Sequence, residues 1–141
     1  MRREEILALV KRRQEAWAAR DPVALAATHA ENGTVASPAG GVLEGRTEIE
    51  RIYRLWISAF TDIVMQLDDI LVDGDRVVLI SRLSGTHTGE FFGLSPGGRR
   101  VEVQVALVMK VAGGLVVEER RIYDFTGVLV QVGVLKAKPT G

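Results

Sequence analysis

The sequence predicts an α+β fold in which helices come first and a strongly curved, mixed or antiparallel sheet follows. Apolar residues recur at helical spacing through the first 60 residues. From Thr61 to Tyr123, runs rich in Val, Ile and Leu are separated by glycine turns, which is typical of a strand meander. This order favours helices packed on one face of the sheet. A length of 141 residues is suited to a single domain, 1–141.

Three helices are predicted in the first part of the chain. Residues 4–17 place apolar side chains three and four positions apart, against a polar side rich in Arg, Lys and Glu. Asp21 followed by Pro22 is an N-cap signal that predicts a second helix over 22–30. After a short strand at 34–37, a third helix is expected over 46–60.

Four longer strands are predicted after the helices, at residues 63–72, 76–86, 99–111 and 115–123. Residues 73–75 and 112–114 are glycine-containing links of hairpin length. A longer Gly/Pro-rich link follows at 89–98, and the apolar tail 125–135 is either a short helix or a closing strand. A sheet bent around one long helix leaves a conical cavity, so a cone-shaped α+β barrel is expected.

Composition narrows the function classes. Eighteen basic residues balance eighteen acidic ones, so nothing favours nucleic acid as a partner. No segment approaches the roughly 18–20 apolar residues of a membrane helix, so no membrane partner is expected. The absence of cysteine is compatible with a reducing cytoplasm. With two histidines and no cysteine, we expect no metal site.

Two segments resemble a known family. Residues 85–94, GTHTGEFFGL, and residues 117–125, VEERRIYDF, are similar to the strand-and-loop signature and the last strand of SnoaL-like polyketide or ester cyclases. These proteins belong to the nuclear-transport-factor-2-like superfamily. Trp17, residues 33–35 and Gly45-Arg46 also fit, so the resemblance covers nearly the whole chain. It implies the cone-shaped fold, an apolar cavity and activity without a cofactor.

The resemblance also implies site residues. In the characterised cyclases an aspartate on the last strand is the general acid/base of ring closure, and it matches Asp124. Polar helpers of the preceding strand correspond to Leu107 and Met109 here, and a frequent tryptophan corresponds to Arg120. The related steroid isomerases need an aspartate where this chain has Ser37, so that activity is not expected.

Each candidate catalytic residue has a structural alternative. Asp124 in an apolar pocket would have a raised pKa and exchange protons near neutrality, but it could instead cap the closing segment. Arg120 could bind a ligand oxygen or form a cross-strand ion pair, and Arg82 carries the same ambiguity. His87 could shuttle protons or fix the glycine-rich loop by a hydrogen bond.

Other residues are expected to contact a small apolar organic ligand. They are aromatic side chains at helical spacing, a histidine near the predicted second helix, and two apolar residues of the 99–111 strand: Trp17, His29, Tyr53, Trp56, Phe60, Leu107 and Met109. The aromatic residues are equally typical of a core.

Strand alternation predicts which side chains face outward. It places Gln104 on the outer face of the sheet, and it also places Glu119, Arg121 and Tyr123 there. A homodimer through this outer face is expected, since the superfamily commonly dimerises in that way.

Three functions remain open: a cofactor-independent cyclase or isomerase that uses Asp124, a non-catalytic ligand-binding or dimerisation module, and an enzyme like the limonene-epoxide hydrolases. The last needs two carboxylates and an arginine around one water molecule.

Overall fold

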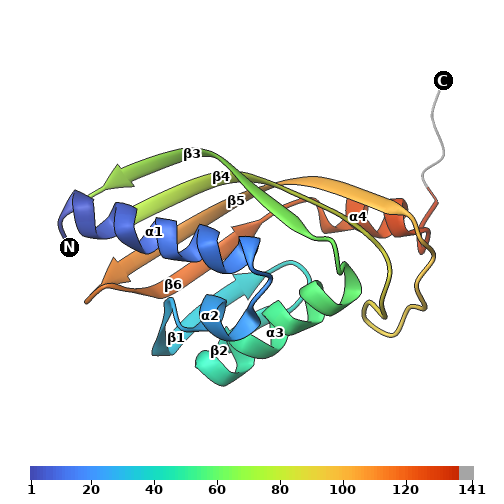
Figure 1. Cartoon of the computed structure of the whole chain (residues 1–141), viewed down its shortest axis with the longest axis horizontal. Coiled ribbons are helices and arrows are strands. Elements are labelled where there is room, and N and C mark those ends of the chain that lie inside the picture. Colours follow the sequence, from blue (N-terminus) through green and yellow to red (C-terminus); the bar gives the residue numbers. More distant parts are fainter. Residues whose placement is uncertain (137–141) are drawn as a thin grey trace.

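A computed structural model describes residues 1–136 of the chain (Figure 1). Two helices, two strands and a third helix come first, and four long strands and a last helix follow. The elements are α1 (Arg3–Ala18), α2 (Pro22–Ala26), β1 (His29–Ser37), β2 (Gly41–Glu44), α3 (Arg46–Ala59), β3 (Val64–Asp73), β4 (Arg76–Thr86), β5 (Arg100–Ala112), β6 (Leu115–Ile122) and α4 (Phe125–Val132).

All the strands form one six-stranded mixed sheet, in the order β2-β1-β6-β5-β4-β3. Strands β3, β4, β5 and β6 pair antiparallel with one another, whereas β1 runs parallel to β6. Helix α1 lies along the concave side of the curved sheet (Figure 1). The predicted α+β cone with three N-terminal helices on a curved sheet is therefore confirmed.

Two local predictions in the first half were wrong. Helix α2 ends at Ala26 rather than near residue 30, and β1 begins already at His29. The Asp21 side chain accepts hydrogen bonds from Val23 N and Ala24 N, so the predicted N-cap is present although the helix is short. The residues from Gly41 to Glu44, for which no strand was predicted, form strand β2 beside β1.

The last helix closes the sheet at the end remote from the N-terminus (Figure 1). Helix α4 lies against β5 where β6 has already ended, and the Gln131 side-chain amide bonds both backbone groups of Glu102. The amide thereby satisfies the backbone N–H and C=O of β5 at a point where no neighbouring strand pairs with them. The tail is a helix, one of the two forms expected for it.

A β-bulge in β6 decides which side chains enter the cone. Lys110 of β5 pairs with Glu118, but Val111 pairs with Val116, so Val117 is an extra residue on β6. Before the bulge Val116 faces inward, and after it Glu119 does. The predicted outward phase of Glu119 is therefore wrong.

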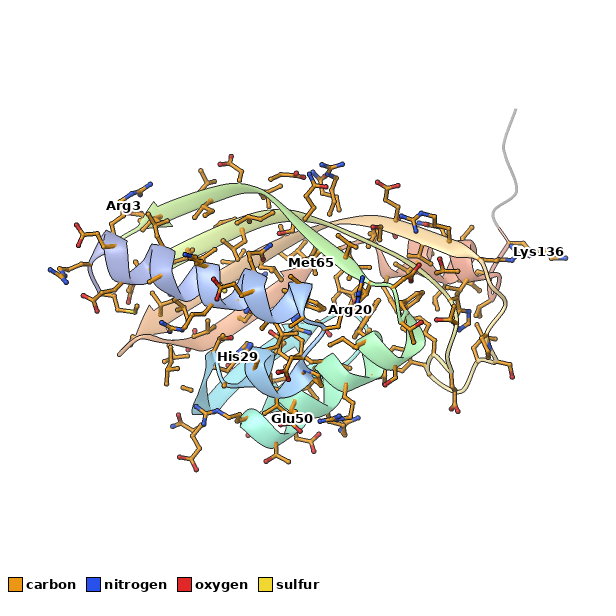
Figure 2. All side chains as sticks on the ribbon, in the orientation of Figure 1. Arg3, Arg20, His29, Glu50, Met65 and Lys136 are labelled. Carbon is orange, nitrogen blue, oxygen red and sulfur yellow. The ribbon has the colours of Figure 1, made fainter. Side chains whose placement is uncertain are left out.

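The core fills the space between the concave sheet face and the helices, and side chains project from every element (Figure 2). Its helix side is an apolar stripe on α1 together with the buried face of α3. Within residues 1–136 no helix has the length and apolar character needed to cross a membrane.

Candidate functional site

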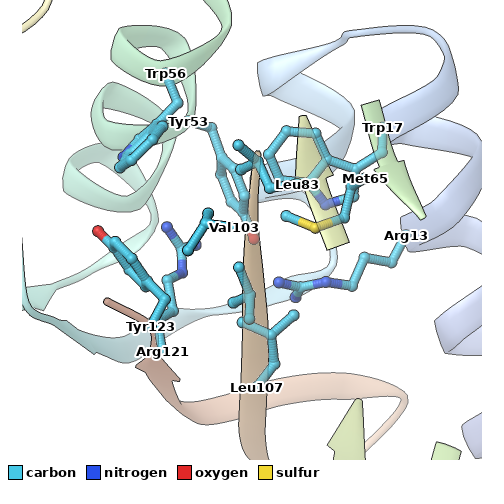
Figure 3. Close-up of a pocket in the computed structure, with 11 residues that line it drawn as sticks. Arg13, Trp17, Tyr53, Trp56, Met65, Leu83, Val103, Leu107, Arg121 and Tyr123 are labelled. Carbon is cyan, nitrogen blue, oxygen red and sulfur yellow. The ribbon is translucent and has the colours of Figure 1, made fainter. Parts of the chain in front are cut away.

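A cavity lies between α1, α3 and the concave face of the sheet (Figure 3). Its volume is about 30 Å³, enough for about two water molecules. Most of its wall is apolar, and two arginines and two tyrosines complete it. The lining residues are Arg13, Trp17, Tyr53, Trp56, Met65, Leu83, Val103, Val105, Leu107, Arg121 and Tyr123.

The polar end of the cavity is a buried cluster of Arg13, Glu119 and Arg121. Arg13 Nη1 lies 2.7 Å from Glu119 Oε1, and Arg121 Nε donates to Glu119 Oε2 at 2.7 Å. The side chains of Arg13 and Glu119 are only 2% and 0% exposed. Two cations share one anion, so the cluster carries a net positive charge inside an apolar core.

Burial and pairing act in opposite directions on the charges of this cluster. Burial alone would raise the pKa of Glu119, but the adjacent Arg13 and Arg121 outweigh it and hold that pKa well below its usual range. Burial also disfavours the charged Arg13, yet Glu119 keeps the pKa of its guanidinium raised. All three groups therefore stay ionised near neutral pH.

Tyr53 links the cluster to a buried histidine. His29 Nε2 lies 2.7 Å from the Tyr53 hydroxyl, and the Arg121 guanidinium carbon stands 4.6 Å from the centre of the Tyr53 ring. Burial lowers the pKa of His29 to about 3, so the imidazole is neutral. Burial also raises the pKa of Tyr53, so its phenol is protonated. In Figure 3 the guanidinium groups of Arg13 and Arg121 point toward Tyr53 from opposite sides.

Three donors at the cavity wall have no hydrogen-bond partner among residues 1–136. They are Arg13 Nε, Trp17 Nε1 and Arg121 Nη2, all of them buried. Buried polar atoms are normally paired, because an unmade hydrogen bond costs about 1–3 kcal/mol. None of the three groups can accept a hydrogen bond. The site is therefore complementary to an oxygen that accepts hydrogen bonds, and above all to an anionic one.

The residues predicted to bind ligand fall into two layers. Trp17, Tyr53, Trp56 and Leu107 line the cavity. Phe60, Met109 and His29 are buried behind it: Phe60 packs beside Trp56, and Met109 Sδ lies 3.8 Å from Arg13 Nη1.

Two of the candidate catalytic residues lie outside the cavity, and for Asp124 the structure shows the capping role that was expected as its alternative. Asp124 is exposed and forms the N-cap of α4, accepting a hydrogen bond from Gly127 N at 2.9 Å. Arg120 is exposed on the outer side of the sheet, because the bulge in β6 turns Arg121 inward instead. A catalytic role for either stays a prediction, and neither side chain lines the cavity.

His87 and Arg82 occupy structural positions. His87 is buried against Phe60 and Phe91, and its Nδ1 accepts from Gly97 N at 3.4 Å, within the glycine-rich loop. Arg82 donates two hydrogen bonds to Asp68 on the sheet surface.

Four polar residues of the site were not predicted: Arg13 was not singled out, and the outward phase expected for Glu119, Arg121 and Tyr123 was wrong. Arg13 could have been found, because it falls at helical spacing inside the apolar stripe of Val10 and Trp17. The other three depend on the bulge at Val117, which alternation alone does not reveal.

No group of three or more potential metal ligands occurs within the described part of the chain. Among residues 1–136 no carboxylate lines the cavity, and Glu119, which lies behind Arg13 and Arg121, is held by two ion pairs. The arrangement needed for epoxide hydrolysis, with a second carboxylate, is not found around this cavity in residues 1–136.

The curved sheet and the helices packed on its concave face define a protein of the nuclear-transport-factor-2-like class, a fold shared by binding proteins and enzymes. A family model for SnoaL-like polyketide cyclases matches residues 8–132. The chain therefore belongs to the SnoaL-like polyketide cyclase family.

Several solved structures are similar over nearly the whole chain. TsrD from Streptomyces laurentii has 26% identity and a TM-score of 0.83, covering 96% of this chain and 99% of that one. IdmH, a candidate polyketide cyclase from Streptomyces antibioticus, has 25% identity and a TM-score of 0.74, covering 89% and 96%. A candidate SnoaL-like cyclase from Jannaschia sp. CCS1 shares the fold at 24% identity and a TM-score of 0.83, covering 96% and 94%. No curated protein matches the sequence.

Proposed function

We propose that the chain binds a small, largely apolar organic molecule by an anionic or enolisable oxygen and stabilises the negative charge on that oxygen. The observation that carries this is the set of three buried, unpaired donors on Arg13, Trp17 and Arg121 at the wall of an apolar cavity. Fixed donors in a water-poor site stabilise an oxyanion strongly, because they need no reorganisation. Family membership supports an oxygen-rich, polyketide-like ligand.

The reaction class that suits this site is a cofactor-independent cyclisation or isomerisation through an enolate. Arg13 and Arg121 would hold the enolate oxygen. Tyr53, whose hydroxyl is 2.7 Å from the neutral His29, would donate a hydrogen bond to that oxygen, and a water molecule in the cavity would take the proton from the α-carbon. Glu119 is a poor base, because its pKa is lowered and both its oxygens are in ion pairs. Its role is to position the two arginines.

Binding is tested by fluorescence, because the chain has two tryptophans and both line the cavity. Hexanoate and hexanamide differ by one charge at nearly equal shape. We expect hexanoate to change the fluorescence at concentrations at least tenfold lower than hexanamide. In Arg121→Gln this preference should disappear, whereas Arg82→Gln, which also removes one positive charge but on the sheet surface, should keep it. Equal binding of the two probes by the unaltered protein would refute an oxyanion site.

Catalysis is tested without knowledge of the substrate, by proton exchange. An enolate-stabilising site should accelerate exchange of the α-protons of 2-heptanone in D2O, followed by NMR. Tyr53→Phe should slow this exchange while leaving hexanoate bound. Binding of hexanoate without accelerated exchange would favour the alternative function, a non-catalytic ligand-binding module. The small volume of the cavity, about 30 Å³, is the observation that keeps this alternative.

A further inference from the structure

The inner cavity is much smaller than a typical ligand site. Pockets for drug-sized molecules usually measure about 300–1,000 Å³. The cavity at Arg13 and Arg121 has about 30 Å³, so it accommodates the oxygen-bearing head of a ligand and little more. If the proposed function holds, the body of the ligand must lie elsewhere.

A surface groove continues the cavity on the other side of Tyr123. The groove has about 320 Å³ and is formed by the end of β6 and the turn between β1 and β2. Arg121 and Tyr123 belong to the walls of both the groove and the cavity. The remaining groove residues are Ala36, Ser37, Pro38, Gly41, Val42, Arg120 and Ile122.

The chemistry of the groove suits an apolar body. Val42 and Ile122 are 69% and 49% exposed, so both offer apolar surface to a ligand. Arg120 adds one cation at the rim and forms no ion pair within residues 1–136. The groove is therefore apolar with one charged edge that favours an acceptor oxygen.

Tyr123 borders both spaces. It meets Trp56 edge to face at 5.9 Å and Phe125 at 6.2 Å. Burial raises the pKa of its phenol to about 12, against the influence of Arg121, Ala39 and Ser37. Tyr123 thus remains a neutral ring, and rotation of this one side chain would join cavity and groove.

We propose that the groove is an outer subsite for the apolar body of an elongated organic anion whose head is bound at Arg13 and Arg121, with Tyr123 as the gate between them. This inference rests on the proposed function of the inner cavity. Arg120 would then lie beside the far end of the ligand and not at the reacting atoms. The ligand class is a carboxylate or enolate with a long alkyl or aryl body.

The test is a chain-length series of alkanoates, followed by tryptophan fluorescence. Affinity should rise from hexanoate to decanoate by roughly two- to fourfold per methylene, because each methylene that binds in the groove removes apolar surface from water. Val42→Glu places a carboxylate in the groove and should weaken decanoate at least tenfold, and should weaken hexanoate, whose body extends less far along the groove, by a smaller factor. Leu71→Glu is the matched control, since Leu71 is 55% exposed on the opposite edge strand β3, and it should leave both affinities unchanged.

The outcomes separate the two proposals. If no alkanoate binds, the oxyanion site itself fails. If hexanoate binds but chain length has no effect, or Val42→Glu binds decanoate normally, the inner site stands and the groove is not a subsite. Tyr123→Ala should accelerate decanoate association severalfold in stopped-flow measurements. Unchanged association would place the entrance elsewhere and overturn the role of Tyr123 as the gate.

Discussion

Replacement of Glu119 by glutamine is the sharpest test of the buried cluster, because it removes one charge and almost no volume. In the native structure Glu119 lies 2.7 Å from Arg13 Nη1 and 2.7 Å from Arg121 Nε. The variant leaves two guanidinium ions in the core without a counterion. Loss of one partner of a buried pair costs about 3–5 kcal/mol. We expect Glu119→Gln to lower the free energy of unfolding by this amount, a large part of the roughly 5–15 kcal/mol typical of a domain.

The measurement is urea unfolding at pH 7, followed by circular dichroism. Glu118→Gln is the control, since Glu118 is the exposed neighbour on β6, and its effect should stay within about 0.5 kcal/mol. Arg13→Met combined with Glu119→Gln should lose less than the two single changes together, because the double variant buries one uncompensated charge fewer. A Glu119→Gln protein as stable as the Glu118→Gln control would refute the buried ion cluster.

Glu119 should also make the free energy of unfolding depend on pH under acid conditions. The pKa of Glu119 is lowered on folding from an ordinary value of 4.5, so the unfolded chain binds its proton more readily. The contribution of Glu119 to stability is therefore complete above about pH 4.5 and falls as the pH drops below it. In Glu119→Gln this contribution is absent, so the free energy of unfolding of the variant should fall less steeply below pH 4.5 than that of the native protein.

The remaining predictions concern other parts of the fold. The pKa of His29 falls from 6.5 to about 3 on folding, so stability should decrease by about 2 kcal/mol between pH 7 and pH 5 in urea titrations, and His29→Gln should abolish that component. Gly89→Ala should cost about 1–3 kcal/mol, because its Cβ would overlap the backbone of Ser58, whereas Gly97→Ala, in open space, should be neutral by thermal unfolding. Asp124→Ala should lose about 1 kcal/mol as a helix cap and leave hexanoate affinity unchanged. The predicted homodimer through the outer sheet face should dissociate in Ala106→Arg, as measured by light scattering, and an unchanged molecular mass would contradict that interface.

The elements that could be predicted are those whose own residues determine them. Strands β3 to β6 came from alternation and glycine turns, and they begin and end within one residue of the predicted bounds. Strand β2 was missed because four residues next to two glycines resemble a turn, and only pairing with β1 makes them a strand. His29 was assigned to a helix end for the same reason, since its place on β1 depends on the parallel partner β6.

The site was harder to predict than the fold because it depends on one extra residue. Alternation along β6 from Val116 would turn Glu118 and Arg120 inward. The bulge at Val117 reverses that phase, so Glu119 and Arg121 enter the core instead. Both phases leave charged residues facing the cavity, so hydrophobicity alone could not select between them.

The balance of charge in the cluster favours a ligand over a purely structural role. A buried ion pair is weak evidence for stability, because well-packed apolar residues in its place are often neutral or stabilising. If the cluster served only to join α1 to β6, one arginine would neutralise Glu119. The second arginine adds a buried charge, and it leaves Arg121 Nη2, like Arg13 Nε, without a partner among residues 1–136. An anionic oxygen in the cavity would balance the charge and accept from both arginines. The excess cation is costly in the empty protein and favourable in a complex, which is the property expected of a binding site.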